Sequence, residues 1–298
     1  MKRELLDFLK MNEVEYKENL QFSNFSSVKI GGIATVVIFP DTEEKIINTI
    51  DFLRKNKFDY KVIGRLTNLL ISNNIEDIIF VKTDKLRGVY VFEKKIRLYA
   101  GERTNALTSF FAKKGIASFC GLSGIPGSIG GMIASNAGAF GTEISDIIET
   151  AVAYSPNEKA LKLLNKEAMS FGYRKSVFQN SDLVLLYADF RVIEDTEDTI
   201  VRRNSEIRSK RLSTQPLSYP SLGSIFKRPN GDFAARLIDK SGLKGFSIGD
   251  AEVSEKHAGF IINKGNATFE DFRAVVEYVK QIVYEKYGIL LEEEIETI

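Results

Sequence analysis

The sequence has no tryptophan, one histidine and one cysteine. A zinc site usually needs three or four nitrogen or sulfur ligands. The single histidine, His257, and the single cysteine, Cys120, are too few to form a metal centre of that kind. A single cysteine also excludes an intramolecular disulfide. No apolar run approaches about 18 residues, the length that indicates a membrane span. The first residues are too charged for a secretory signal. We therefore expect a cytoplasmic protein without a metal.

Net charge is also nearly absent, because 41 Lys and Arg residues face 40 Asp and Glu residues. Such a balance gives no general attraction for nucleic acid or for an anionic membrane, so neither partner is expected. An anionic ligand must then be held by local charge. Residues 201–264 hold 12 basic against 6 acidic side chains, which makes this segment the place to expect one, although a solvated helix face explains much of it. We expect a monomer.

The chain is long enough, at 298 residues, for more than one domain. Strand and helix patterns alternate through residues 1–85, shorter strands dominate 86–195, and long helical patterns appear in 196–298. This order predicts an α+β protein with those three domains. The patterns predict a strand at 35–40, a helix at 44–56 capped by Asp41 and Glu44, a helical piece near Lys166, a long helix from Thr268 to Gly288 and a closing strand at 289–298.

Glycine is concentrated in one segment, with seven of the 22 glycines between Gly121 and Gly141. Glycine permits positive φ angles and lets a ligand approach bare backbone N–H groups, so the segment could hold a phosphate. Its spacing matches neither the GxGxxG fingerprint nor the GxxxxGK[ST] loop. A tightly turned connection between sheet elements explains the same glycines, so spacing alone leaves both interpretations open.

A set of longer motifs goes further. GIPGSIGG, NAGAFG and FGYRKSVF in the middle are followed by QPLSYPSLGSIFKRP, LIDKSGLKG, AEVSEKHAGFIIN and LEEEI. Their order and spacing, from about Asn24 to Glu296, resemble the UDP-N-acetylenolpyruvoylglucosamine reductase family in its shorter form. The resemblance implies non-covalent FAD between two small α/β domains of the vanillyl-alcohol-oxidase type, with a third domain that closes over a UDP-sugar. It also implies that NADPH reduces the flavin, which then reduces the enolpyruvyl ether of UDP-N-acetylglucosamine in peptidoglycan precursor synthesis.

Three residues match the family's catalytic positions. Arg174 in FGYRKS would grip the substrate carboxylate, Ser224 in LGSIFKRP would donate a proton to the α-carbon, and Glu294 in LEEEI would steady the intermediate. A serine is a poor acid, so a neighbouring cation or a hydrogen-bond network would have to polarise it, and Lys227 and Arg228 are the candidate cations. Without the motifs, a surface arginine, a turn serine and a solvated glutamate would be the simpler interpretation.

Cofactor and substrate residues follow from the same resemblance. The segments SVKIGG, GRLTN, GIPGS and NAGAFG predict cofactor contacts at Gly31, Gly32, Gly64, Thr67, Asn68, Gly124, Ile125, Pro126, Gly127, Ser128, Asn136 and Gly138. Substrate contacts are predicted at Tyr173, Arg211, Lys227 and Arg228. One departure stands in GRLTN, where Leu66 replaces a glycine of the family's GxGSN loop, and we expect altered loop geometry or weaker FAD affinity.

Two other functions remain open at this level. Another flavin oxidoreductase of the same FAD fold would share the first half but not QPLSYPSLGSIFKRP or LEEEI. A non-catalytic nucleotide-binding relative is suggested by Leu66, but a binding role gives no reason to keep Arg174, Ser224 and Glu294 together.

Overall fold

The computed structural model describes residues 2–298, which form two compact units. Unit 1 contains residues 2–19, 35–65 and 77–209, and unit 2 contains residues 20–34, 66–76 and 210–298. The chain therefore passes between the units several times, once at Arg65 and Leu66 inside the GRLTN segment. The mixed helix and strand content confirms the α+β class. The division into domains at 85 and 195 is finer than these units and stays a prediction.

Unit 1 is built around two sheets. The first has the strand order β1-β2-β5-β3, and β5 pairs in parallel with both β2 and β3. The second is antiparallel, with the order β11-β10-β12-β7-β6. The strands are β1 Glu15–Gln21, β2 Ile33–Phe39, β3 Tyr60–Ile63, β5 Ile79–Lys82, β6 Val89–Val91, β7 Lys95–Tyr99, β10 Ile148–Ser155, β11 Ala160–Asn165 and β12 Val184–Arg191, with the small pair β8 Gly138–Ala139 and β9 Thr142–Glu143.

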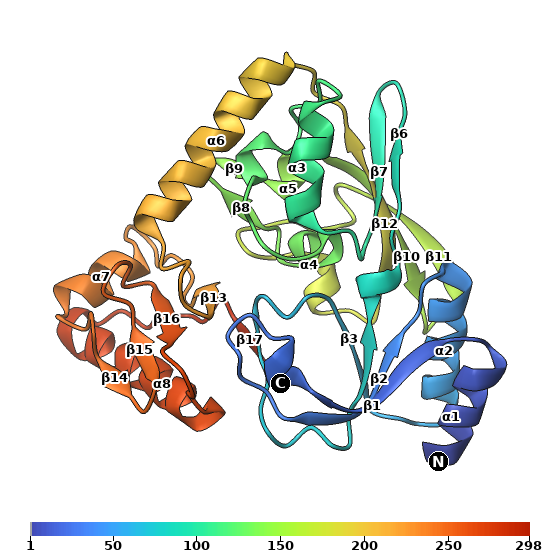
Figure 1. The fold of residues 1–298 in the computed structure, drawn as a ribbon, viewed down its shortest axis with the longest axis horizontal. Coiled ribbons are helices and arrows are strands. Elements are labelled where there is room, and N and C mark those ends of the chain that lie inside the picture. Colours follow the sequence, from blue (N-terminus) through green and yellow to red (C-terminus); the bar gives the residue numbers. More distant parts are fainter. Residues whose placement is uncertain (1) are drawn as a thin grey trace. The chain divides into compact units, whose positions relative to one another are not determined.

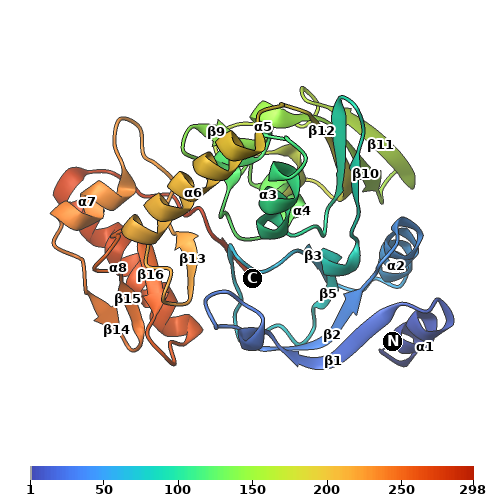
Figure 2. The same ribbon diagram turned by 45° about the horizontal axis from the view of Figure 1, so that its top comes forward.

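Helices cover these sheets, and Figures 1 and 2 show α1 and α2 side by side next to the first sheet. The rings of Phe8 and Phe52 stack between these two helices with centroids 4.1 Å apart. The helices are α1 Lys2–Met11, α2 Glu43–Lys55, α3 Thr104–Ala112, α4 Ile129–Ala134 and α5 Ile144–Ile147, with 3-10 turns η2 Thr83–Lys85, η3 Cys120–Leu122 and η4 Val177–Gln179. Helix α6 Glu197–Thr214 begins in unit 1 and ends in unit 2.

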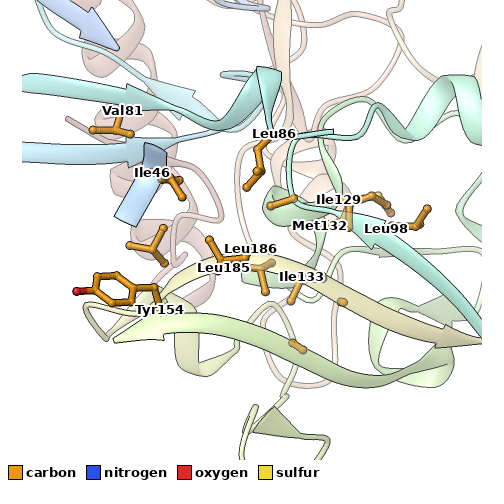
Figure 3. Close-up of a cluster of buried hydrophobic side chains, with 14 of the residues drawn as sticks. Ile46, Val81, Leu86, Leu98, Ile129, Met132, Ile133, Tyr154, Leu185 and Leu186 are labelled. Atoms are coloured by element: carbon orange, nitrogen blue, oxygen red, sulfur yellow. The ribbon is translucent and has the colours of Figure 1, made fainter. Parts of the chain in front are cut away.

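One hydrophobic core joins both sheets of unit 1. Figure 3 shows Ile46 of α2 and Val81 of β5 in the same cluster as Leu185 and Leu186 of β12. Met132 of α4 belongs to this cluster as well. Each fully buried aliphatic side chain contributes about 1.5–3 kcal/mol to folding, so this shared core fixes α4 and the loops that precede it.

Unit 2 has its own core and an antiparallel sheet of order β13-β16-β15-β14. Its elements are η1 Phe22–Asn24, β4 Leu69–Leu70, β13 Ser221–Ser224, α7 Ala234–Lys240, β14 Ser247–Ile248, β15 Ala251–Val253, β16 Phe260–Asn263, α8 Phe269–Tyr287 and β17 Glu296–Thr297. The expected long helix is α8. Thr268 and Asp271 form a capping box at its start, and Gly288, with φ 67°, ends it in the left-handed conformation.

Several local predictions were wrong. The N-cap of α2 is Thr42, whose hydroxyl accepts the N–H of Lys45, because its side chain stands one residue nearer the first turn than Asp41. The segment at Lys166 is a turn after β11, a strand that the sequence patterns did not reveal. The closing strand is only β17, which pairs in parallel with β4, since the preceding residues pair irregularly with the β13 segment.

No helix among residues 2–298 combines the length and apolarity needed to cross a membrane. Those residues also contain no group of three or more His, Cys, Asp or Glu side chains placed to hold a metal ion. Cys120 is buried in a small cluster with Ala112 and Ile200, and burial raises the pKa of its thiol.

The segment that leads to β17 is held by an ion-pair network. Glu293 contacts Arg273, and it accepts hydrogen bonds from Lys280 at 3.1 Å and from Nη2 of Arg273 at 3.2 Å. Burial raises the pKa of Glu293, but the hydrogen bonds from Arg273 and Lys280 outweigh it and leave the pKa below its ordinary value. Glu292, by contrast, is exposed and pairs loosely with Lys227 at 3.4 Å.

We predict that Glu293→Gln destabilises the protein by about 1–3 kcal/mol, because two partly buried cations lose their shared carboxylate. Glu292→Gln is the matched control and should cost less than about 0.5 kcal/mol, as expected for an exposed pair. Urea unfolding of the two variants at pH 7 measures the difference. Equal stabilities would show that the network contributes nothing.

The parent protein and Glu293→Gln together test the pH dependence of this stabilisation. A carboxyl group whose pKa is lowered on folding stabilises the native state above its unfolded pKa, which is near 4.5 for glutamate, and loses that stabilisation as the pH falls through the folded pKa. The stability gap between the parent and Glu293→Gln should therefore narrow below about pH 4.5. A gap that stays constant down to pH 3 would contradict this assignment.

Candidate active site

The GIPGS segment forms a tight loop that leads into α4. Gly124 and Gly127 have φ angles of 76° and 135°, values that a side chain disfavours. Thr104 binds this loop twice, since its hydroxyl donates to the Ile125 carbonyl at 2.5 Å and its N–H donates to the Gly127 carbonyl at 3.4 Å. Ser128 is buried and caps α4 by accepting the N–H of Gly131. Pro126 lies between the two tied carbonyls, and the loop is thus held rigidly by unit 1.

The first glycine of GRLTN lies against this loop. A Cβ atom on Gly64 would stand 2.7 Å from the hydroxyl oxygen of Ser128, which is closer than real Cβ contacts. The absence of a side chain at Gly64 therefore allows the two loops to meet. Two loops of this kind, brought together with several residues in conformations that glycine favours, suit a ligand that binds through backbone N–H groups.

Leu66 retains the backbone conformation that a glycine would adopt. Its φ angle is 56°, in the left-handed region, and its side chain is only 2% exposed. Within unit 2, the Leu66 carbonyl accepts the N–H of Ser27 at 3.2 Å and the hydroxyl of Ser27 at 3.0 Å. Thr67, the next residue, is half-buried. The replacement of glycine thus costs backbone strain but buries a leucine, and its effect on FAD affinity stays a prediction.

Gly31 and Gly32 serve the protein's own packing. A Cβ on Gly32 would lie 2.6 Å from the carbonyl oxygen of Asn73, and one on Gly31 would lie 2.9 Å from the Cβ of Phe22. The Gly32 N–H donates to Ser72 and its carbonyl accepts from Phe22. Close approach of unit 2 main chains explains both glycines, and the predicted cofactor contact at these positions remains a proposal.

Asn136 and Arg174 form one cluster in unit 1. The buried Asn136 amide donates to Glu143 at 2.9 Å and to the Gly172 carbonyl at 3.0 Å, while its oxygen accepts the N–H of Ser145. Arg174 has a left-handed φ of 54° and donates to the carbonyls of Asn136 at 3.4 Å and Gly138 at 3.0 Å. The Asn136 side chain is therefore a structural brace, and it orients the loop that holds the Arg174 guanidinium.

Ser224 and Glu294 come together in unit 2. The N–H of Glu294 donates to the carbonyl of Ile225, the residue after Ser224, at 2.8 Å. Asn68 joins them, because its side-chain amide donates to the Glu294 carbonyl at 3.0 Å. Ser224 is exposed at the end of β13, and Glu294 is half-buried. Of the three neighbouring glutamates, Glu293 belongs to its ion-pair network and Glu292 faces solvent. The role of Glu294 in the site stays a prediction.

The predicted substrate residues have different surroundings. In unit 1, the Arg174 guanidinium lies 5.2 Å from the ring centroid of Tyr173. In unit 2, the N–H of Lys227 donates to the Glu292 carbonyl at 2.9 Å, and the Arg228 guanidinium lies 5.0 Å from the Phe233 ring centroid. Arg211 of α6 is 7% exposed, and burial lowers the pKa of its guanidinium.

Sequence patterns missed the side chains that hold these loops. Thr104, Ser27 and Lys82 all bind loop carbonyls, and Lys82 donates to Gly64. From the sequence, Lys82 at the end of the apolar run IIFVK is expected to be a solvent-exposed residue at the end of a strand. The one available signal is that the run before it is apolar on both faces, which is typical of a strand buried on both sides.

We predict that Leu66→Ala is less stable than Leu66→Gly by about 1 kcal/mol, because only alanine retains the left-handed strain. Both lose the buried side chain, at about 2–5 kcal/mol relative to the parent. The buried Leu237, in the middle of α7, supplies the control pair. There the order should reverse, with glycine the less stable. Thermal and urea unfolding measure all four variants, and the same order at both positions would refute the strain at Leu66.

Comparison with known proteins assigns the chain. Residues 215–298 match the family model for the UDP-N-acetylenolpyruvoylglucosamine reductase C-terminal domain, and residues 34–163 match that for an FAD binding domain. The chain is 40% identical to the UDP-N-acetylenolpyruvoylglucosamine reductase of Caldanaerobacter subterraneus, over 99% of this chain and 98% of that protein. It is 37% identical to the enzyme of the same name from Clostridium novyi, over 97% and 94%.

Solved structures agree with this assignment. The reductase from Thermus caldophilus superposes with a TM-score of 0.80 and 29% identity, over 95% of this chain and 98% of that one. A BBE-like 1 variant from Physcomitrella patens, with a TM-score of 0.50 and 14% identity over 64% and 44%, shows a likeness of fold alone. On these matches, which run along nearly the whole chain, the protein belongs to the UDP-N-acetylenolpyruvoylglucosamine reductase family.

Proposed function

We propose that the protein reduces the enolpyruvyl ether of UDP-N-acetylglucosamine to UDP-N-acetylmuramate, with FAD as its cofactor and NADPH as the electron donor. The observation that carries this proposal is the match to named reductases over almost the full length of both chains. A cytoplasmic monomer working in peptidoglycan precursor synthesis is part of the same proposal.

The residues of unit 1 fit a bound FAD. The meeting of Gly64 with Ser128, and the positive φ angles of Gly124 and Gly127, provide backbone that a diphosphate can approach. Ile125, Pro126 and Gly138 of unit 1 would contribute to the same site. The contacts at Thr67 and Asn68 stay predictions from the family motif. When bound, FAD would supply the two-electron chemistry that links NADPH oxidation to reduction of the substrate double bond.

Arg174 would bind the substrate carboxylate. Reduction of the enolpyruvyl double bond builds negative charge next to that carboxylate, and a fixed cation lowers the energy of such a state. Hydrogen bonds to the Asn136 and Gly138 carbonyls hold the guanidinium in place before substrate arrives. A planar guanidinium with several N–H donors suits a carboxylate better than a lysine would.

Ser224 would deliver the proton that completes the reduction. Its exposure at the end of β13 leaves the hydroxyl accessible to a ligand. The adjoining Lys227 and Arg228 would favour a transient alkoxide by their positive charge. Glu294, tied by its main chain to Ile225 and Asn68, would steady the charge that develops on the substrate. Arg211, Lys227 and Arg228 would bind the diphosphate of the UDP-sugar, and Tyr173 would pack against the substrate.

Purified protein tests the function directly. It should be yellow, and anaerobic NADPH should bleach its flavin absorbance. Addition of the enolpyruvyl UDP-sugar should restore the colour and yield a product heavier by two hydrogens, detected by mass spectrometry. Protein that folds but binds no FAD, or a bleached flavin that the enolpyruvyl substrate never reoxidises, would overturn the proposal.

Ser224→Ala separates the two halves of the reaction. The variant should still bleach with NADPH, since the serine acts only in substrate reduction, but reoxidation by the enolpyruvyl substrate should slow by about 10²–10⁴-fold, the usual contribution of a general acid. Ser221→Ala, on the same strand, is the control and should react normally. Stopped-flow absorbance measures both half-reactions, and normal reoxidation in Ser224→Ala would exclude the serine as proton donor.

A further inference from the structure

Lys82 is a buried cation beside the candidate cofactor loops. It ends β5, and its side chain is 5% exposed. The ammonium group donates to the Gly64 carbonyl at 2.9 Å and to the Asp84 carboxylate at 2.5 Å. Burying a charge is costly unless it is paired and hydrogen-bonded, so a lysine at this position needs both partners. An apolar side chain could fill the end of β5 without that cost.

The hydrogen bond to Gly64 determines the direction of a peptide group. A peptide bond is planar and trans, so the carbonyl of Gly64 and the N–H of Arg65 point in opposite directions. With the carbonyl oxygen held by Lys82, the N–H of Arg65 is directed away from Lys82. A carbonyl oxygen repels an anion, whereas an N–H binds one, so this orientation decides whether the loop suits a phosphate.

The surrounding charges favour an anion as well. Arg65 lies 4.0 Å from Asp84, and Arg87 donates to the Asp84 carbonyl at 2.6 Å. Arg103 pairs in a β-bridge with Ser128, the residue against which Gly64 lies. Lys82 and Arg65 thus pair with the Asp84 carboxylate, whereas Arg87 binds its main-chain carbonyl and Arg103 lies next to Ser128. A cluster with this excess of positive charge, on loops of glycine and tied carbonyls, matches the diphosphate half of a dinucleotide better than its flavin ring.

We propose that Lys82 is a positioning residue for the diphosphate of the cofactor: it holds the Gly64 carbonyl, turns the Arg65 N–H toward the ligand, and leaves Arg65 and Arg103 to balance the phosphate charge. This inference rests on the proposed function, because it takes the ligand to be FAD. It assigns a role to a side chain that never touches the reacting atoms.

Lys82→Met tests the role, and affinities for FAD and riboflavin separate it from a general effect on folding. Riboflavin lacks phosphate, so a lysine that prepares a phosphate site should matter only for FAD. We expect FAD to bind the deflavinated variant about 10–100-fold more weakly, the range for a hydrogen bond involving a charged group. Riboflavin affinity should change less than about twofold. Lys85→Met, which removes a neighbouring exposed lysine, should bind both ligands as the parent does.

A second variant guards against misfolding, because Lys82→Met leaves Asp84 without its ammonium partner. Lys82→Met with Asp84→Asn removes both charges, and circular dichroism should show a native fold. The double variant should still bind FAD weakly. Recovery of FAD affinity in it would mean that Lys82 only neutralises Asp84, and an equal loss of riboflavin and FAD in Lys82→Met would mean a general disturbance. Either result overturns the inference.

These outcomes are distinct from failure of the proposed function. Parent protein that binds no FAD would refute the function itself. Parent protein that binds FAD, together with Lys82→Met of equal FAD affinity, would refute only the role of Lys82. Lys82→Arg, which keeps a cation near the carbonyl, should recover part of the lost FAD affinity.

Discussion

The close approach of Gly64 to Ser128 is the contact on which the candidate cofactor site depends. Two loops from different parts of unit 1 meet there, and a side chain at position 64 would displace the Ser128 hydroxyl. A side chain also binds a main-chain carbonyl in each loop: Thr104 donates to Ile125, and Lys82 donates to Gly64. Rigid loops with their carbonyls already bound lose little freedom when a ligand arrives, so such a site is organised before binding.

Much of the fold was predictable from the sequence, because the signals were local. Helix α8 has a capping residue, an apolar stripe and a terminal glycine, and all three lie within the continuous segment from Thr268 to Gly288. Strand β11 was missed because alternating Leu and Lys residues next to a charged turn resemble a solvated segment. Helix α4 was missed because Gly130 and Gly131 are poor helix formers, and its stability comes from Met132 and its neighbours in the shared core.

The candidate site was predictable only in part. Motifs predict roles for Arg174, Ser224 and Glu294 that stay predictions, and the structure adds the reasons for their local placement. Asn136 illustrates the limit, since its motif suggests a ligand contact while its amide is used to brace the loop. Gly32 is similar, because the backbone of Asn73 leaves no room for a side chain at position 32. A motif can indicate that a residue has a role, but the residue that it contacts is distant in the sequence and is known only from the structure.

The buried position of Cys120 has a practical value for studying this protein. A thiol that is shielded from solvent and whose pKa is raised by burial reacts slowly with maleimides. Little label should therefore attach to Cys120 when spin or fluorophore labels are directed to an introduced cysteine. One cysteine introduced on the surface of a unit would carry the reporter, and its signal would show how that unit responds to an added ligand.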